Sequence, residues 1–154
     1  MFVLTYYAII IFASIVINRY KLNNEHHLYK LFNTLYNVSL SRISLYLLLA
    51  GIYVVVSQEI YFDFNRLSCE SLEILKPYMN IFFNLKFIEW FDTIHLLLKS
   101  NGDLFKLSTL HHVHHAIVPD MTYGALGSGG EIVVMLTNCL AHFLMYGYYV
   151  SPKK

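Results

Sequence analysis

Five long apolar runs limit how this chain can fold more than any other feature of its sequence. A helix needs about 20 apolar residues to cross the hydrocarbon core of a bilayer, and each run approaches that length. A soluble domain of 154 residues cannot bury all five runs, and 56% hydrophobic against 14% charged residues leaves little polar surface for water. We therefore predict an all-α, polytopic transmembrane protein, a single domain over residues 1–154 with spans at about 2–17, 37–57, 78–98, 107–126 and 131–150.

The charges that follow these runs predict how the chain is oriented in the membrane. Cytosolic loops are enriched in Lys and Arg, and Arg19, Lys99 and Lys154 follow the first, third and fifth runs. We therefore expect a lumenal N-terminus. The alternative that residues 2–17 form a cleavable signal peptide is weakened by the lack of basic residues before this run. With a net charge of +1 and no basic face, the chain is expected to contact membrane lipid and no nucleic acid.

The third predicted span carries three ionisable residues, Lys86, Glu89 and Asp92, at intervals of three. A charged group inside a membrane helix costs about 3 kcal/mol on insertion scales, so its presence suggests a function. The spacing brings Lys86 close to Glu89 and Glu89 close to Asp92. These residues predict either part of a polar site or an ion-pair network that only fixes helix packing. Thr93 is expected to bond to its local backbone, and His95 to be a polar core or interface residue.

Four histidines lie within five positions of the fourth predicted span. His111, His114 and His115 share one helix face, whereas His112 points about 100° away. Neutral imidazole titrates near physiological pH, so this face suits metal ligation, general acid–base transfer or nucleophilic attack on an acyl group. Packing alone does not explain so many imidazoles in a membrane segment. Pro119 predicts a kink in the second half of this span.

The fifth predicted span adds a stripe of three polar residues four positions apart, Asn138, His142 and Tyr146. Helical spacing places all three on one face of an otherwise apolar helix. For His142 alone a structural role is favoured, whereas the neighbouring histidine face makes a functional role as good an interpretation as a structural one. The neighbouring histidine face makes this stripe a second candidate element of the site.

Together these residues resemble the very-long-chain fatty acid elongase (ELO) family. The eight residues from Lys86, KFIEWFDT, are similar to the family's KxxExxDT pattern. The five residues from His111, HHVHH, are similar to its HxxHH box, and the nine from Asn138, NCLAHFLMY, to its NxxxHxxMY pattern. Tyr36 and Asn37 resemble the family's Tyr-Asn pair. The resemblance implies a multi-pass protein of the endoplasmic reticulum membrane, with about five of the seven spans of the family's helical barrel in this chain.

The resemblance also implies a reaction. It implies an acyltransferase, a very-long-chain 3-oxoacyl-CoA synthase, which condenses acyl-CoA with malonyl-CoA to give 3-ketoacyl-CoA, CO2 and CoA. His114 is the implied nucleophile, held as an acyl-imidazole, and His111, His115 or His142 would stabilise the enolate or position the thioester. Lys86, Glu89, Asp92, Asn138 and Tyr146 are implied as supporting or substrate-binding residues.

Beyond its two CoA substrates, the expected reaction needs no cofactor and no metal. The resemblance implies as candidate partners the ketoacyl-CoA reductase, the dehydratase and the enoyl reductase of the elongation cycle, together with a second copy of this chain. The acyl length and saturation preference do not follow from the motifs.

The sequence departs from the family pattern in two respects. His95 and His112 occupy positions that are usually apolar, and the helix that carries the family's two-glutamine motif is not in this sequence. We interpret the chain as a C-terminally truncated elongase; a second copy that supplies the missing wall and an inactive protein are the alternatives. Two other functions stay open. One is a non-catalytic relative that acts as a membrane partner, and the other is a membrane di-iron desaturase or hydroxylase, which needs several histidine boxes.

Overall fold

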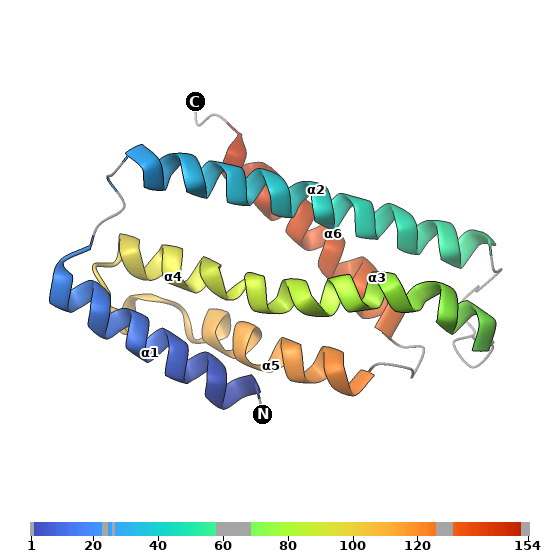
Figure 1. Cartoon of the computed structure of the whole chain (residues 1–154), viewed down its shortest axis with the longest axis horizontal. Coiled ribbons are helices and arrows are strands. Elements are labelled where there is room, and N and C mark those ends of the chain that lie inside the picture. The colour runs from blue at the N-terminus through green and yellow to red at the C-terminus, as the bar shows by residue number, and fades with distance from the viewer. Residues whose placement is uncertain (1, 23–24, 26, 58–68, 126–130, 152–154) are drawn as a thin grey trace. The chain divides into compact units, whose positions relative to one another are not determined.

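A computed structural model describes residues 2–22, 25, 27–57, 69–125 and 131–151 of the chain (Figure 1). These residues form helices, and within them no strand is present. Three helical segments, Phe2–Tyr20, His27–Ser57 and Ile132–Val150, are long and apolar enough to cross a membrane. The predicted all-α, polytopic membrane class is therefore confirmed. The elements are α1 (Phe2–Tyr20), α2 (His27–Ser57), α3 (Cys69–Ile88), α4 (Trp90–Lys99), the 3-10 helix η2 (Leu104–Lys106), α5 (Thr109–Ala125) and α6 (Glu131–Val150).

The third predicted span differs from the observed helices at its start and in its continuity. A proline suits the first turn of a helix, and the span predicted at 78–98 places Pro77 at its start. Helix α3 instead begins at Cys69, so Pro77 lies inside it. A proline is tolerated inside a helix at the loss of one backbone hydrogen bond, so Pro77 did not mark the start. The helical path is also divided at Glu89, after which α4 begins. That α3 with α4, and α5, cross the membrane stays a prediction.

The chain forms two compact units, and each is described by itself. Unit 1 comprises residues 1–33 and 83–124, which hold α1, the start of α2, the end of α3, α4, η2 and α5. Unit 2 comprises residues 34–82 and 125–154, which hold most of α2 and α3 together with α6. The predicted single domain stays a prediction.

In unit 1, helix α1 buries one face against α4 and α5, and α1 and α4 lie side by side (Figure 1). The buried residues of α1 recur every three or four positions, which is the spacing of a single helix face. Tyr6 and Leu97 are fully buried in the same apolar cluster, to which α5 contributes Ala116. The ring of Phe2 extends the packing, since its centroid lies 5.1 Å from that of Phe87 and 6.1 Å from that of Tyr123. The buried residues of α1 are Tyr6, Ile10, Ser14 and Ile17.

Hydrogen bonds hold both ends of α1 in unit 1. At its start, the carboxylate of Asp120 on α5 accepts from the backbone N–H groups of Phe2, at 3.5 Å, and Val3, at 3.2 Å. Towards its end, the hydroxyl of Ser14 donates to the carbonyl oxygen of Gly102 at 2.6 Å, and the amide of Asn18 donates to the same oxygen at 3.3 Å. Only glycine suits position 102, because its φ is +80° and a Cβ would lie 2.9 Å from the Asn18 side chain.

In unit 2, helices α2 and α6 approach closely through small residues. A Cβ on Gly51 would lie 2.7 Å from the Met135 and Leu136 side chains, so glycine permits this approach. The hydroxyl of Ser41 donates to the carbonyl oxygen of Phe143 at 3.3 Å. Small residues at close contacts are typical of helix packing in membranes. The buried face of α2 alternates spacings of three and four: Asn37, Leu40, Ser44, Leu47, Gly51 and Val54.

Candidate functional site

The histidine cluster, which comprises His111, His114 and His115, occupies the first turns of α5. Ser108 caps this helix. The backbone N–H of His111 donates to the Ser108 hydroxyl at 3.1 Å, and that of His112 donates to the Ser108 carbonyl at 3.3 Å. A serine immediately before a helix satisfies amide groups that have no partner within the helix. Ser108 thus fixes where the helix begins and, with it, the direction in which each imidazole points.

The structure brings the three histidines of the predicted face together in unit 1. The ring centroids of His111 and His115 lie 4.5 Å apart, and those of His114 and His115 lie 5.2 Å apart, both pairs edge to face. His115 is buried, whereas His111 and His114 are half-buried. The cluster is therefore partly shielded from solvent and still accessible to a ligand. The catalytic roles of the three residues stay predictions.

Beside the cluster lies the buried ion pair that the spacing of the third span predicted. The ammonium of Lys86 donates to Oε1 of Glu89 at 2.5 Å, and the two side chains are only 2% and 5% exposed. The predicted pairing of Lys86 with Glu89 is therefore confirmed, and the part of these residues in the site stays a prediction.

A chain of side-chain hydrogen bonds joins α1, α4 and α5. The hydroxyl of Tyr6 lies 3.1 Å from Oγ1 of Thr93 and 3.0 Å from Nδ1 of His112. Oγ1 of Thr93 lies 2.9 Å from Nε2 of His111, and Nε2 of His112 lies 3.4 Å from the carbonyl oxygen of Leu104. The expectation that Thr93 bonds to its local backbone is therefore wrong, because its hydroxyl bonds to two side chains from other helices.

A second link runs from α4 to the backbone of the histidine cluster. Pro119 has no N–H, so it cannot donate to the carbonyl of His115 four residues earlier in α5. The indole N–H of Trp90 donates to this carbonyl at 2.9 Å. Trp90 is buried, and its ring packs against those of Tyr6 and Phe87. Trp90 therefore anchors the helix turn that carries His115.

His95 lies apart from these links, buried on α4 in unit 1. Its ring centroid lies 5.6 Å from that of Tyr29 and 6.1 Å from that of Phe32, both on the first turns of α2. Burial and these two neighbouring aromatic rings give His95 the surroundings of a core residue.

Unit 2 carries the remaining predicted residues on α6. His142 and Tyr146 are buried, with ring centroids 5.3 Å apart, and Asn138 is half-buried. The ring of Tyr146 also packs edge to face against that of Tyr36 on α2, at 6.2 Å. The three residues form the polar stripe that their spacing predicts, and their part in the reaction stays a prediction.

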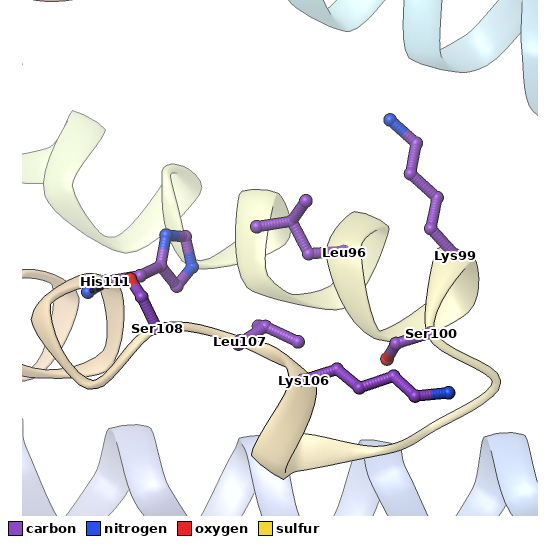
Figure 2. Close-up of a pocket in the computed structure, with 7 residues that line it drawn as sticks. All are labelled: Leu96, Lys99, Ser100, Lys106, Leu107, Ser108 and His111. Atoms are coloured by element: carbon purple, nitrogen blue, oxygen red, sulfur yellow. Dashed lines mark hydrogen bonds between the residues drawn. The ribbon is translucent and has the colours of Figure 1, made fainter.

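A pocket of about 350 Å³ opens beside the histidine cluster in unit 1. Figure 2 shows His111 at one end of the pocket and the side chains of Lys99 and Lys106 towards the other. Lys99 and Lys106 supply two cations near a histidine, a setting for an anionic ligand, although the ammonium of Lys106 also lies 3.9 Å from the Asp103 carboxylate. The pocket is lined by Leu96, Lys99, Ser100, Lys106, Leu107, Ser108 and His111.

Three residues of the site were missed by reasoning from the sequence: Tyr6, Trp90 and His112. Tyr6 lies in an apolar run in which an aromatic residue is usually packed or in contact with lipid. One signal was present, because Tyr6 and Ser14 are eight residues apart and so share the buried face of α1. In the part of the chain that is described, no group of three or more His, Cys, Asp or Glu side chains is arranged to hold a metal ion.

The fold and the site define a helical membrane protein with a half-buried histidine cluster. A sequence profile of the GNS1/SUR4 family (ELO) matches residues 1–153, so the chain belongs to this family. It is similar to "Fatty acid elongase 6" of Leishmania major, with 38% identity over 72 residues. This match covers 45% of the chain and only 18% of the length of that relative. No solved structure matches the chain.

Proposed function

We propose that this chain contributes the catalytic histidine cluster of a fatty acid elongase, which condenses acyl-CoA with malonyl-CoA to form 3-ketoacyl-CoA, CO2 and CoA. The observation that carries the proposal is the group of three adjoining imidazoles beside the buried pair of Lys86 and Glu89. Membership in the GNS1/SUR4 family and the similarity to a fatty acid elongase support the same reaction.

In this mechanism His114 is the nucleophile. A neutral ring nitrogen of His114 attacks the thioester carbonyl of acyl-CoA, and the carbon–sulfur bond breaks to release CoA thiolate, which takes up the proton lost by the imidazole. Malonyl-CoA then loses CO2, and the electron pair of the broken bond forms an enolate carbon. That carbon attacks the acyl group and expels the imidazole, which regains a proton. His111, His115 and His142 position the thioester or stabilise the enolate.

Charged residues near the cluster have two proposed roles. The charge of Lys86 stabilises negative charge that develops at the thioester oxygen. Lys99 and Lys106, which line the pocket beside His111, bind phosphates of CoA (Figure 2). Glu89 and Asp92 manage protons near the imidazoles, and Asn138 and Tyr146 contact substrate.

The proposed location is the endoplasmic reticulum membrane, with a lumenal N-terminus. In this orientation the segment from Lys99, at the end of α4, to Lys106, at the end of η2, faces the cytosol, where CoA esters are available. Because the product is a 3-ketoacyl-CoA, the proposed partners are the ketoacyl-CoA reductase, the dehydratase and the enoyl reductase that act on it in turn.

The test measures incorporation of labelled malonyl-CoA into longer acyl-CoA by the protein in membranes. We expect His114→Ala to lower the rate by roughly 100-fold or more, because an essential nucleophile is removed. The matched control is His27→Ala, which removes an exposed histidine of α2 that lies outside the cluster. Unchanged turnover in His114→Ala would refute the assignment of the nucleophile.

A second measurement tests the covalent step without relying on turnover. The protein is incubated with labelled acyl-CoA in the absence of malonyl-CoA, quenched, digested and examined by mass spectrometry. We expect an acyl group on the peptide that contains His114, and its loss in His114→Ala. If the unsubstituted protein and His114→Ala both carried the acyl group on another histidine, that histidine would be the nucleophile.

A further inference from the structure

The hydrogen-bond chain from Leu104 to His111 has a direction that its chemistry fixes. It begins at the backbone carbonyl of Leu104, which can only accept a hydrogen bond. Nε2 of His112 lies 3.4 Å from this oxygen, so Nε2 must carry a proton. A neutral imidazole has one N–H and one acceptor nitrogen. Nδ1 of neutral His112 is therefore an acceptor.

Each following bond has only one possible donor. The Tyr6 hydroxyl, 3.0 Å from Nδ1 of His112, must donate its single proton there. Its oxygen can then only accept from the hydroxyl of Thr93, at 3.1 Å. Because the Thr93 hydroxyl donates its only proton to Tyr6, its oxygen can only accept from Nε2 of His111, which lies 2.9 Å away. It follows that neutral His111 has its proton on Nε2 and a lone pair on Nδ1.

Burial strengthens this constraint on the two hydroxyls in the middle of the chain. Tyr6 and Thr93 are both 0% exposed, so water does not compete for either group. The reverse direction would need protons on both nitrogens of His112, which would place a net positive charge on that ring. The direction from His111 to the Leu104 carbonyl is therefore the one that a neutral His112 ring requires.

We propose that Tyr6 is a positioning residue, which acts through Thr93 to hold neutral His111 with its proton on Nε2 and its Nδ1 lone pair available to the histidine cluster. His111 also lines the pocket beside the cluster (Figure 2). This role rests on the proposed function: Nδ1 accepts the proton released when an imidazole of the cluster attacks the thioester, and returns it to the departing CoA thiolate.

The structural part of the proposal is tested by nitrogen NMR of the full chain, labelled with ¹⁵N-histidine, in lipid bilayers. Imidazole ¹⁵N shifts distinguish a protonated ring nitrogen from an unprotonated one, and His111→Gln assigns the signals. We expect His111 to have a protonated Nε2 and an unprotonated Nδ1. Tyr6→Phe should replace this single tautomer by a mixture of two. The control, Tyr7→Phe, removes a neighbouring hydroxyl outside the chain of bonds and should leave the spectrum unchanged.

The catalytic part is tested on the same variants by malonyl-CoA incorporation. Tyr6→Phe should lower kcat about tenfold and leave KM for acyl-CoA unchanged, because proton transfer is impaired and binding is not. Tyr7→Phe should match the unsubstituted protein in both constants. A protonated Nδ1 in unsubstituted His111, or shifts that Tyr6→Phe does not change, would overturn the inference while the proposed function stands. A lack of incorporation by the unsubstituted protein would overturn the proposed function, and the tautomer would still be measured.

Discussion

The two units hold their helices together in different ways. In unit 1, the polar side chains of α1, α4 and α5 bond to one another, through Tyr6, Thr93 and His111 among others. In unit 2, α2 and α6 meet at small residues such as Gly51, and the described hydrogen bond between them runs from the Ser41 hydroxyl to the backbone carbonyl of Phe143. Hydrogen bonds fix the orientation of individual groups, whereas small residues fix only the distance between backbones. The oriented contacts surround the histidine cluster, where the direction of each ring decides its chemistry.

The largest expected effect on stability comes from breaking the buried ion pair of unit 1. Lys86→Met leaves the Glu89 carboxylate buried without its cation, so the free energy of unfolding in detergent micelles should fall by about 3–5 kcal/mol. The double variant Lys86→Met/Glu89→Leu should recover much of this loss, because no buried charge remains. The matched control is Lys76→Met, which breaks the exposed pair with Glu73 at the same spacing and should cost well under about 1 kcal/mol. Equal losses at both pairs would contradict the role of burial.

The next effect tests the close approach in unit 2. Gly51→Ile places a branched side chain where a Cβ already meets Met135 and Leu136 at 2.7 Å, so unfolding should become easier by about 1–3 kcal/mol. In the control, Gly124→Ile, a Cβ has nothing within 4 Å, and stability should not fall. If the two variants were equally stable, close approach would not explain the glycine at position 51.

The third effect concerns the carbonyl that Trp90 holds. Trp90→Phe keeps an aromatic ring but removes the donor to the His115 carbonyl, which should cost about 1–3 kcal/mol of stability. Pro119→Ala in the same protein restores a backbone N–H for that carbonyl. The double variant should therefore be more stable than Trp90→Phe alone, as measured by a double-mutant cycle. Strict additivity of the two changes would show that the carbonyl does not couple them.

The smallest effect tests the cap of α5. Ser108→Ala removes the acceptor for the His111 amide. The free energy of unfolding should fall by about 1 kcal/mol, and hydrogen exchange at that amide should become faster. Ser108→Asp retains a side-chain acceptor and should keep the exchange rate close to its original value. Slow exchange in Ser108→Ala would show that another group protects the amide.

What the sequence predicted well was local along the chain. Spacing alone placed Lys86 beside Glu89, and grouped His111 with His114 and His115, because helical periodicity determines which neighbours share a face. It could not identify partners on other helices. Thr93 and Trp90 both belong to the eight-residue motif that begins at Lys86. The bond of Thr93 to Tyr6 and that of Trp90 to the His115 carbonyl nevertheless depend on how the helices pack. The start of α3 was also missed, because Pro77 fits both inside a helix and at its beginning.

The bonds at the two ends of α1 determine its register as well as its position. Asp120 holds the amides of Phe2 and Val3, and Gly102 holds the side chains of Ser14 and Asn18. A shift of one residue would move the helix about 1.5 Å along its axis and turn it about 100°. Such a shift would break the contacts at both ends and turn Tyr6 away from Thr93. The contacts at the two ends of α1 therefore determine the position of the Tyr6 hydroxyl between them.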